Sequence, residues 1–488
     1  MQIWTDQHSL TRSTTVEIKM IFDSREAAKR ARQEAILNGP VFTTLMQLAL
    51  PTTLVLIAQT LVNVAETYYV SFLGTSALIG VALVFPLWML MTMMAAGGIG
   101  GGVASAVARA TGAGKHDDVN ALILHSTVVA IVFGLAFTAL FIGAGEYIYA
   151  AMGGAGDALS AAHEYSVYVF FASVPIWIVN LLCAVLRGIG NVKVPATVTL
   201  IGALVLIPLS PLLIFGLGPI KGFGLAGAGI AINLYYWIAA LAMLRYMSSG
   251  RAGIRMTFVR LRWSLLGEIL KVGLLAALGT IQLNVMVLLI TGAVGVFGVD
   301  AIGGFGTASR LDYVMIPVLF GIGTAIVTMV GINVGARQID RAKQITWVGV
   351  TISVVFTGVV GLFVAIFPDV WLSLFTHDES VKVTGKLYLQ IVAPFYAANG
   401  ILFALGFAAQ GSGYMWRIFL AGTLRLILAA GGGWIAVKFL GVGPSGLFTI
   451  VMSSMVIAAA LSIVIDRSGA MWPRYKKPGR SPLSFTRP

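Results

Sequence analysis

The chain has 488 residues, of which 58% are hydrophobic and 10% are charged, and its mean hydropathy is +0.92. Soluble domains carry about 25% charged residues, so this composition excludes a soluble globular protein. The net charge of +13 would suggest nucleic acid as a partner in a soluble protein, but no separate basic domain is present, which argues against nucleic-acid binding.

Twelve apolar windows follow one another along the chain, and a membrane-spanning helix needs about 20 such residues. In chain order the windows cover residues 35–65, 67–108, 120–145, 165–186, 194–220, 222–244, 272–299, 313–336, 344–368, 387–416, 418–437 and 439–465. The second window contains the end of the first helix, a short turn and the second helix. Since backbone in lipid must satisfy its own hydrogen bonds, these continuous runs predict an all-α membrane protein with twelve transmembrane helices.

Lysine and arginine indicate the orientation, because they gather in cytoplasmic loops. With the N-terminus inside, four of the 32 lie on the outer side and two, Arg310 and Arg425, lie within spans, which leaves 26 inside. We therefore expect a multi-pass protein of the cell (inner) membrane with both termini cytoplasmic. The basic surplus is typical of contact with anionic membrane lipids.

The two halves of the chain resemble each other at an offset of 223 to 224 residues. Gly112-Ala113 corresponds to Gly335-Ala336, and the segment 187–190 corresponds to the segment 410–413. Gly74, which opens GTSALIG, corresponds to Gly298, which opens GVDAIGG. Each half has six helices, so we predict two six-helix lobes related by pseudo-twofold symmetry, the architecture of alternating-access transporters.

The predicted organisation has five parts. They are a cytoplasmic tail (residues 1–38), an N-lobe with helices 1–6 (39–247), a basic cytoplasmic loop (248–263), a C-lobe with helices 7–12 (264–466) and a basic cytoplasmic tail (467–488). The first 34 residues are polar and mixed in charge, which is atypical of a cleavable signal peptide.

No catalytic constellation is evident. The five histidines are scattered, the single Cys183 excludes a four-cysteine zinc site, and no nucleotide-binding motif is present. The sequence therefore predicts neither an enzyme nor a metal site nor a bound cofactor. Transport would draw its energy from an ion or substrate gradient.

Several motifs, in order and spacing over residues 40–465, resemble the multidrug and toxic compound extrusion (MATE) transporters. They include the first helix, ALPTTLVLIAQTLVNVAETYYVSFLG, the GAGK turn after the second helix, LRGIGNVKVP, LSPLLIFG with GFGLAGAGIAI, and in the second half ASRLDYVMIPVLFGIGTA and NVGARQIDRA. The resemblance implies a MATE-like fold and the export of organic cations and drugs, coupled to a proton or sodium gradient. It implies an organic cation or drug-like molecule as partner and function as a monomer.

Glu66 and Asp312 are carboxylates inside predicted spans, where a charge is costly unless it is paired or hydrated. Glu66 stands where many members of this family have an aspartate, so it is the first candidate to exchange a proton, a sodium ion or a cationic substrate. The alternative is an interfacial carboxylate, because Gly74 follows eight residues later.

Ion and substrate binding is predicted for a set of polar residues within the spans: Glu66, Asn63, Gln59, Asn180, Gln282, Asn284, Asp312 and Asn399. The resemblance is incomplete here. Where one branch of the family has an asparagine and an aspartate on helix 5, this chain has Leu206 and Ser210, and the glutamate and aspartate of another branch on helices 7 and 10 are missing. Asp312 either replaces the missing carboxylate of the second lobe or forms a structural ion pair. Arg310, Arg187 and Arg425 are predicted to be structural or pairing residues.

Helix 2 contains AAGGIGGG at residues 95–102, which predicts either close helix packing or a hinge. Ten bulky residues are candidates for an adaptable apolar lining, with core or lipid-facing positions as the alternative: Met89, Met91, Met93, Met94, Phe170, Phe171, Trp177, Tyr235, Tyr236 and Trp237.

Other functions remain open at this point. A lipid-linked oligosaccharide flippase of the same superfamily has the two-lobe layout, but the few basic residues inside spans disfavour it. A membrane-embedded transferase would need an aspartate- or histidine-rich cluster, and a channel would not explain the repeat.

Overall fold

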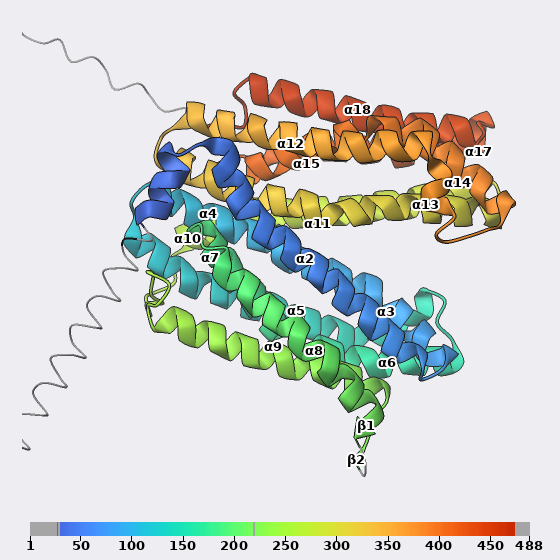
Figure 1. Ribbon diagram of the computed structural model, residues 1–488, viewed down its shortest axis with the longest axis horizontal. Coiled ribbons are helices and arrows are strands. Elements are labelled where there is room, and N and C mark those ends of the chain that lie inside the picture. Colours follow the sequence, from blue (N-terminus) through green and yellow to red (C-terminus); the bar gives the residue numbers. More distant parts are fainter. Residues whose placement is uncertain (1–26, 28–29, 218–219, 474–488) are drawn as a thin grey trace, which may run out of the picture.

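The computed structural model describes residues 27, 30–217 and 220–473, which lie in two groups of helices side by side (Figure 1). The first 26 residues of the predicted N-terminal tail and the predicted C-terminal tail beyond residue 473 lie outside the described residues. Residues 30–38 are helical, and the carbonyl of Ile36 accepts a hydrogen bond from Asn333 Nδ2 at 3.3 Å. The end of the predicted tail therefore packs against the second group.

The first group, the N-lobe, runs from α2 to α9. Its elements are α2 (Val41–Ser71), α3 (Thr75–Met93), the π-helix η1 (Met94–Ile99), α4 (Gly100–Gly112), α5 (His116–Ala151), α6 (Gly156–Phe171), α7 (Ser173–Gly188), α8 (Lys193–Phe215), the antiparallel pair β1 (Gly216–Leu217) and β2 (Ile220–Lys221), and α9 (Leu225–Ser248).

The second group, the C-lobe, runs from α10 to α18. Its elements are α10 (Trp263–Gly295), α11 (Val299–Gly335), α12 (Ile339–Ile366), α13 (Pro368–Leu372), α14 (Glu379–Val392), the 3₁₀ turn η2 (Ala393–Phe395), α15 (Tyr396–Ser412), α16 (Trp416–Leu426), the π-helix η3 (Ile427–Gly432), α17 (Gly433–Leu440) and α18 (Pro444–Arg467).

Within the described ranges, eleven helical spans are long and apolar enough to cross a membrane, and α6 with α7, which meet at 46°, make a twelfth. The prediction of twelve membrane helices in two lobes is confirmed. The span α11 begins at Val299, fourteen residues before the predicted start at residue 313, because its charged residues Asp300, Arg310 and Asp312 do not interrupt the helix.

The backbone repeats the relation between the halves. A positive φ recurs at equivalent turns before or after the helices, in the pairs Gly74 (103°) and Gly298 (111°), Gly114 (70°) and Arg337 (63°), and Gly190 (77°) and Gly413 (84°). The bend at Ala172 between α6 and α7 corresponds to η2 between α14 and α15. The repeat read from a few motifs thus extends to turns and helix breaks.

The lobes meet at the end of the molecule where both described chain ends lie and diverge toward the opposite end (Figure 1). At the meeting point a Cβ on Gly112 of α4 would lie 1.9 Å from the carbonyl oxygen of Ile332, and one on Gly335 of α11 would lie 2.1 Å from that of Arg109. Only glycine permits backbones to approach this closely. We call this contact of α4 with α11 the glycine seal.

The AAGGIGGG run of helix 2 extends the same contact. Gly98 packs against Ala277 of α10, Gly102 faces the carbonyl of Ile269, and Ser105 Oγ donates a hydrogen bond to the carbonyl of Gln410. Close packing between the lobes is therefore the observed role. The π-helix η1 covers residues 94–99 of this region. Since π-helices often occur at functional sites, the hinge hypothesis stays a prediction.

The basic loop between the lobes is fastened to α5. The backbone N–H of Arg262 donates to His125 Nε2 at 2.8 Å, and the Arg262 guanidinium forms an ion pair with Asp118 at 2.8 Å. His125 Nδ1 lies 2.8 Å from the carbonyl of Ala121, so the hydrogen bonds assign the proton to Nδ1. The buried His125 thus holds the loop at the start of α10.

Candidate functional site

A cavity of about 210 Å³ lies inside the N-lobe, closed on one side by α11 of the C-lobe. Its wall comes from α2, α3, α7, α8 and α9. Its polar lining consists of Gln59, Thr60, Asn63, Glu66, Thr92, Asn180, Thr199, Tyr235, Tyr236 and Tyr313. Large apolar side chains complete it, among them Trp88, Met89, Met93 and Phe320. The cavity therefore combines a few polar groups with an adaptable apolar wall, which is typical of small-molecule sites.

Glu66 is the only Asp, Glu, Lys or Arg residue among those that line this cavity. It lies near the end of α2, and Gln59 and Asn63 precede it by seven and three residues on the same face of the helix. Ser210 of α8 donates its hydroxyl to Glu66 Oε1 at 3.3 Å. The site therefore holds one acidic group and no basic one, and a cation that enters it is attracted to Glu66 when its carboxyl group is ionised.

The amides of Gln59 and Asn63 are open to a ligand. Neither forms a side-chain hydrogen bond to another part of the chain that the structure describes, whereas the hydroxyls of Thr60, Thr92 and Thr199 bond carbonyls of their own helices. Asn180 Nδ2 donates to the carbonyl of Ile176 at 2.9 Å. The structure thus brings together four of the predicted binding residues: Gln59, Asn63, Glu66 and Asn180.

The other four predicted binding residues lie in the C-lobe, away from this cavity. Gln282 Nε2 donates to Thr423 Oγ1 at 2.7 Å and so joins α10 to α16. Asn284 is exposed and bonds the carbonyl of Thr280 in its own helix. Both residues lie on α10 of the C-lobe and not among the residues that line the cavity of Glu66.

Asp312 and Asn399 belong to a buried polar cluster in the C-lobe, which we call the C-lobe cluster: Asp312, Tyr388, Tyr396, Asn399 and Arg425. Tyr388 donates to Asp312 Oδ2 at 3.5 Å, and Arg425 Nη1 donates to Asn399 Oδ1 at 3.1 Å. Asp312 and Arg425 also attract each other electrostatically. Asp312 Oδ1, the Tyr396 hydroxyl and Arg425 Nε are buried without a hydrogen-bond partner in the described part of the chain. The cluster balances one negative and one positive charge.

The remaining predicted pairing residues differ in their surroundings. Arg310 is exposed and lies over the ring of Phe375 at 5.5 Å, so it does not share the surroundings of Asp312. Arg187 lines a gap of about 10 Å³ between the lobes together with Gln410 and Phe407, and its carbonyl accepts a hydrogen bond from Thr328 at 3.0 Å. Arg187 therefore lies on the contact between the lobes.

The sequence comparison noted Ser210 only as a non-acidic residue at a helix 5 position of the family, and it did not predict the hydrogen bond to Glu66, because that bond depends on how α8 packs against α2. Of the ten bulky candidates, Met89, Met93, Tyr235 and Tyr236 line the cavity. Met91, Phe170 and Trp177 are buried in the core, Met94 is partly buried against it, and Phe171 and Trp237 are exposed on the outside. The helical phase that separates these groups depends on lobe packing and cannot be read from composition.

Comparisons with known proteins match both halves of the chain. A family model described as MatE matches residues 51–212 and 276–435. The chain is 27% identical to a probable multidrug resistance protein NorM of Thermotoga maritima, covering 87% of this chain and 92% of that one. It is 25% identical to the FAD transporter of Shewanella oneidensis, covering 76% and 82%. A solved MOP superfamily transporter from Pyrococcus furiosus has a TM-score of 0.82 at 24% identity, covering 90% of this chain and 98% of that one. The structural likeness supports the two-lobe fold, and the two matched blocks lie one in each lobe.

Proposed function

Because the chain belongs to the MatE family, it is a multi-pass membrane transporter of the efflux type and not an enzyme, and we propose that it exports organic cations in exchange for a proton or a sodium ion. The family expected from the sequence motifs is confirmed by the family model. Beyond the family, we propose the charge of the substrate, the ion that drives transport and the residues that bind them.

One observation carries this proposal, namely that Glu66 is the single charged side chain lining the N-lobe cavity. Two unit charges 4 Å apart interact by about 4 kcal/mol at an effective dielectric constant of 20, so one carboxylate can hold either a coupling ion or a cationic substrate. Both compete for the same oxygen atoms. The substrate is exchanged for the coupling ion if the site releases one of these two cations only when the other binds.

The cavity lining supports an organic cation. Trp88, Tyr235, Tyr236 and Tyr313 line the site, and aromatic rings can hold a cation through their ring electrons. Gln59, Asn63 and Asn180 offer amide groups that position polar parts of a substrate. We restrict the proposed binding set to these three residues and Glu66, because Gln282, Asn284, Asp312 and Asn399 lie outside the cavity.

A flavin dinucleotide fits this cavity less well, although one relative is named an FAD transporter. Its phosphates would meet Glu66 with no lysine or arginine among the lining residues. The same argument applies to a pyrophosphate-linked oligosaccharide. The charge of the cavity therefore favours cations over both alternatives.

The mechanism proposed is alternating access. With the glycine seal closed, the lobes diverge at the end away from the described chain ends. The lysine and arginine distribution assigns the closed end to the cytoplasm, which makes this the outward-facing arrangement. Binding of a proton or a sodium ion to Glu66 would favour conversion of the outward-facing arrangement to the inward-facing arrangement. The protein would act as a monomer in the cell membrane.

Transport by the full chain in proteoliposomes, with a proton or a sodium gradient imposed separately, tests the proposal. We expect gradient-driven movement of a cationic dye, and we expect Glu66→Gln to lower it at least tenfold, because the only charge of the site is lost. Glu66→Asp should retain part of the activity.

Glu164→Gln is the matched control, since Glu164 is an exposed carboxylate outside the cavity. It should transport like the unmodified chain. Undiminished gradient-driven efflux in Glu66→Gln contradicts the role of Glu66. FAD transport without dye transport would favour the dinucleotide instead.

A further inference from the structure

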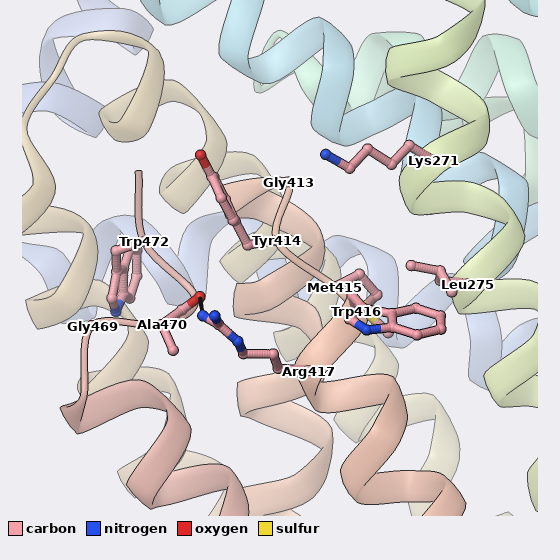
Figure 2. A pocket seen from close by; sticks show the side chains of 10 residues that line it. All are labelled: Lys271, Leu275, Gly413, Tyr414, Met415, Trp416, Arg417, Gly469, Ala470 and Trp472. Carbon is pink, nitrogen blue, oxygen red and sulfur yellow. Dashed lines mark hydrogen bonds between the residues drawn. The ribbon is translucent and has the colours of Figure 1, made fainter. Parts of the chain in front are cut away.

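A second cavity, of about 490 Å³, lies far from Glu66, at the end of the molecule where the described chain ends lie. It is formed by the first part of α10, the turn between α15 and α16, the start of α16 and the segment after α18. Figure 2 shows Lys271 of α10 reaching toward Tyr414, with Arg417 and Trp472 across the opening. Nothing in the proposed transport cycle uses this cavity.

The lining carries two positive charges, Lys271 and Arg417, and no carboxylate. Lys271 Nζ lies 6.0 Å from the centre of the Tyr414 ring. Arg417 Nη1 donates to the carbonyl of Ala470 at 2.6 Å, which orients the guanidinium and leaves its other N–H groups to a ligand. Backbone N–H groups at the start of α16 add partial positive charge.

Two carboxylates lie near the cavity, and other side chains already bind both of them. Asp466 accepts hydrogen bonds from the indole N–H groups of Trp347 at 3.0 Å and Trp472 at 2.8 Å. Glu268 forms an ion pair with Arg109 at 3.4 Å. Among the described residues, neither Lys271 nor Arg417 forms an ion pair with a carboxylate, and an anion is the ligand that complements the two charges.

Apolar side chains continue from the cavity along both helices. Lys271, Leu274 and Leu278 follow the spacing i, i+3, i+7 on α10, and the two leucines are 43% and 47% exposed. Trp416 and Leu420 on α16 follow the spacing i, i+4 and are 57% and 45% exposed. Each helix thus presents a polar or aromatic residue at the cavity and exposed apolar residues beyond it, which matches a molecule with an anionic head and hydrocarbon tails.

We propose that this cavity binds the headgroup of an anionic phospholipid, with its phosphate between Lys271 and Arg417 and its acyl chains along α10 and α16. Basic pockets between membrane helices are known sites for such headgroups, and tryptophan is common at membrane interfaces. The bound lipid would join α10 to α16 and to the segment after α18.

The test compares the full chain in neutral detergent with phosphatidylglycerol, with phosphatidylcholine, with glycerol 3-phosphate and with inorganic phosphate. We expect phosphatidylglycerol alone to raise the thermal unfolding temperature and to remain bound in native mass spectra. Lys271→Gln/Arg417→Gln should weaken its binding on the order of tenfold, because two positive charges near an anionic lipid are removed. Lys271→Arg/Arg417→Lys should retain the binding.

Arg251→Gln/Arg260→Gln is the charge-matched control, since both arginines are exposed on the loop before α10 and lie outside the cavity. It should bind phosphatidylglycerol like the unmodified chain. An equal loss in both double variants would show unspecific charge attraction and overturn the proposal. Equal stabilisation by inorganic phosphate would identify a soluble anion, and absence of a phosphatidylglycerol effect on the unmodified chain would overturn the site altogether.

Discussion

The two carboxylates predicted from the sequence, Glu66 and Asp312, have opposite surroundings. Glu66 faces a cavity without a basic residue, and its one hydrogen bond comes from Ser210. Asp312 lies in the C-lobe cluster with Tyr388 and the guanidinium of Arg425 nearby. A carboxylate without a counter-ion is suited to binding a mobile cation, whereas a compensated one is suited to holding a lobe together.

Asp312→Asn should therefore destabilise the protein rather than abolish coupling. The substitution leaves Arg425 buried without its counter-charge, and we expect a loss of about 2 kcal/mol in the free energy of unfolding. Thermal unfolding in detergent measures this loss. The double variant Asp312→Asn/Arg425→Gln should recover part of it, because both charges are then removed.

Proteoliposome transport by the folded fraction of Asp312→Asn tests whether Asp312 has a role in coupling instead. If gradient-driven efflux is lost while the unfolding temperature is unchanged, Asp312 acts as a second coupling carboxylate. The function assigned to the C-lobe cluster would then be wrong.

The sequence predicted Glu66 and three amide residues of the cavity but not the hydrogen bond from Ser210. Glu66 is conspicuous because a carboxylate in a span is rare. Ser210 is 144 residues away, and its role depends on the packing of α8 against α2. Gln282 and Glu66 are both polar residues in spans, and the sequence alone does not show that they lie in opposite lobes.

At the scale of helices, the closest contact between the lobes is backbone against backbone. Gly112 and Gly335 each lie against a carbonyl of the other helix. Among the described residues, the ion pair Arg109–Glu268 adds to this contact at 3.4 Å, and exposed pairs contribute about 0–1 kcal/mol. Shape rather than charge therefore holds this end closed.

Gly112→Val should separate the lobes at the glycine seal, because its Cβ would lie 1.9 Å from the carbonyl oxygen of Ile332. Spin labels at Asp117→Cys and Asp340→Cys, at equivalent starts of α5 and α12, report the separation in a Cys183→Ala background. We expect the distance distribution to shift to longer values.

Gly143→Val provides the control, since a Cβ at Gly143 in α5 has no neighbour within 4 Å. Its distance distribution should match that of the labelled parent. An unchanged distance distribution in Gly112→Val would show that the glycine seal accommodates the valine without separation of the lobes, which contradicts the prediction.

The helices were largely predictable from charge-free windows, and the errors have a common cause. The window rule ends a span at a charge, but α11 continues through Asp300, Arg310 and Asp312. These charged side chains lie near interaction partners or at the surface, and their positions cannot be read from the linear sequence. The bend at Ala172 was not predicted either, because it depends on how α6 and α7 pack.

For the whole molecule, the uneven distribution of lysine and arginine predicts that both termini face the cytoplasm. The hairpin β1–β2 with Lys221 lies at the opposite end from the described chain ends (Figure 1). In a Cys183→Ala background, Lys221→Cys should react with a membrane-impermeant maleimide added to intact cells. Arg251→Cys should react only after permeabilisation.

Both positions are exposed, so accessibility of the side chain does not distinguish them. The reverse labelling pattern would invert the orientation and place the glycine seal on the outside. The direction of transport proposed above would then be inverted as well.

A fused chain can carry different residues at equivalent positions of its two halves, whereas two identical subunits cannot. The reciprocal contact of Gly112 and Gly335 resembles the isologous interface of a twofold homodimer, in which every residue appears twice. By the offset of 224 that relates Gly74 to Gly298, the counterpart of Glu66 is the buried Ile290, and that of Asp312 is Trp88 of the cavity wall. Two halves joined in one chain can differ in sequence, so Glu66 and Asp312 can stand at positions that do not correspond. A homodimer of the first half would carry two copies of Glu66, and its central space would have no asymmetry of charge.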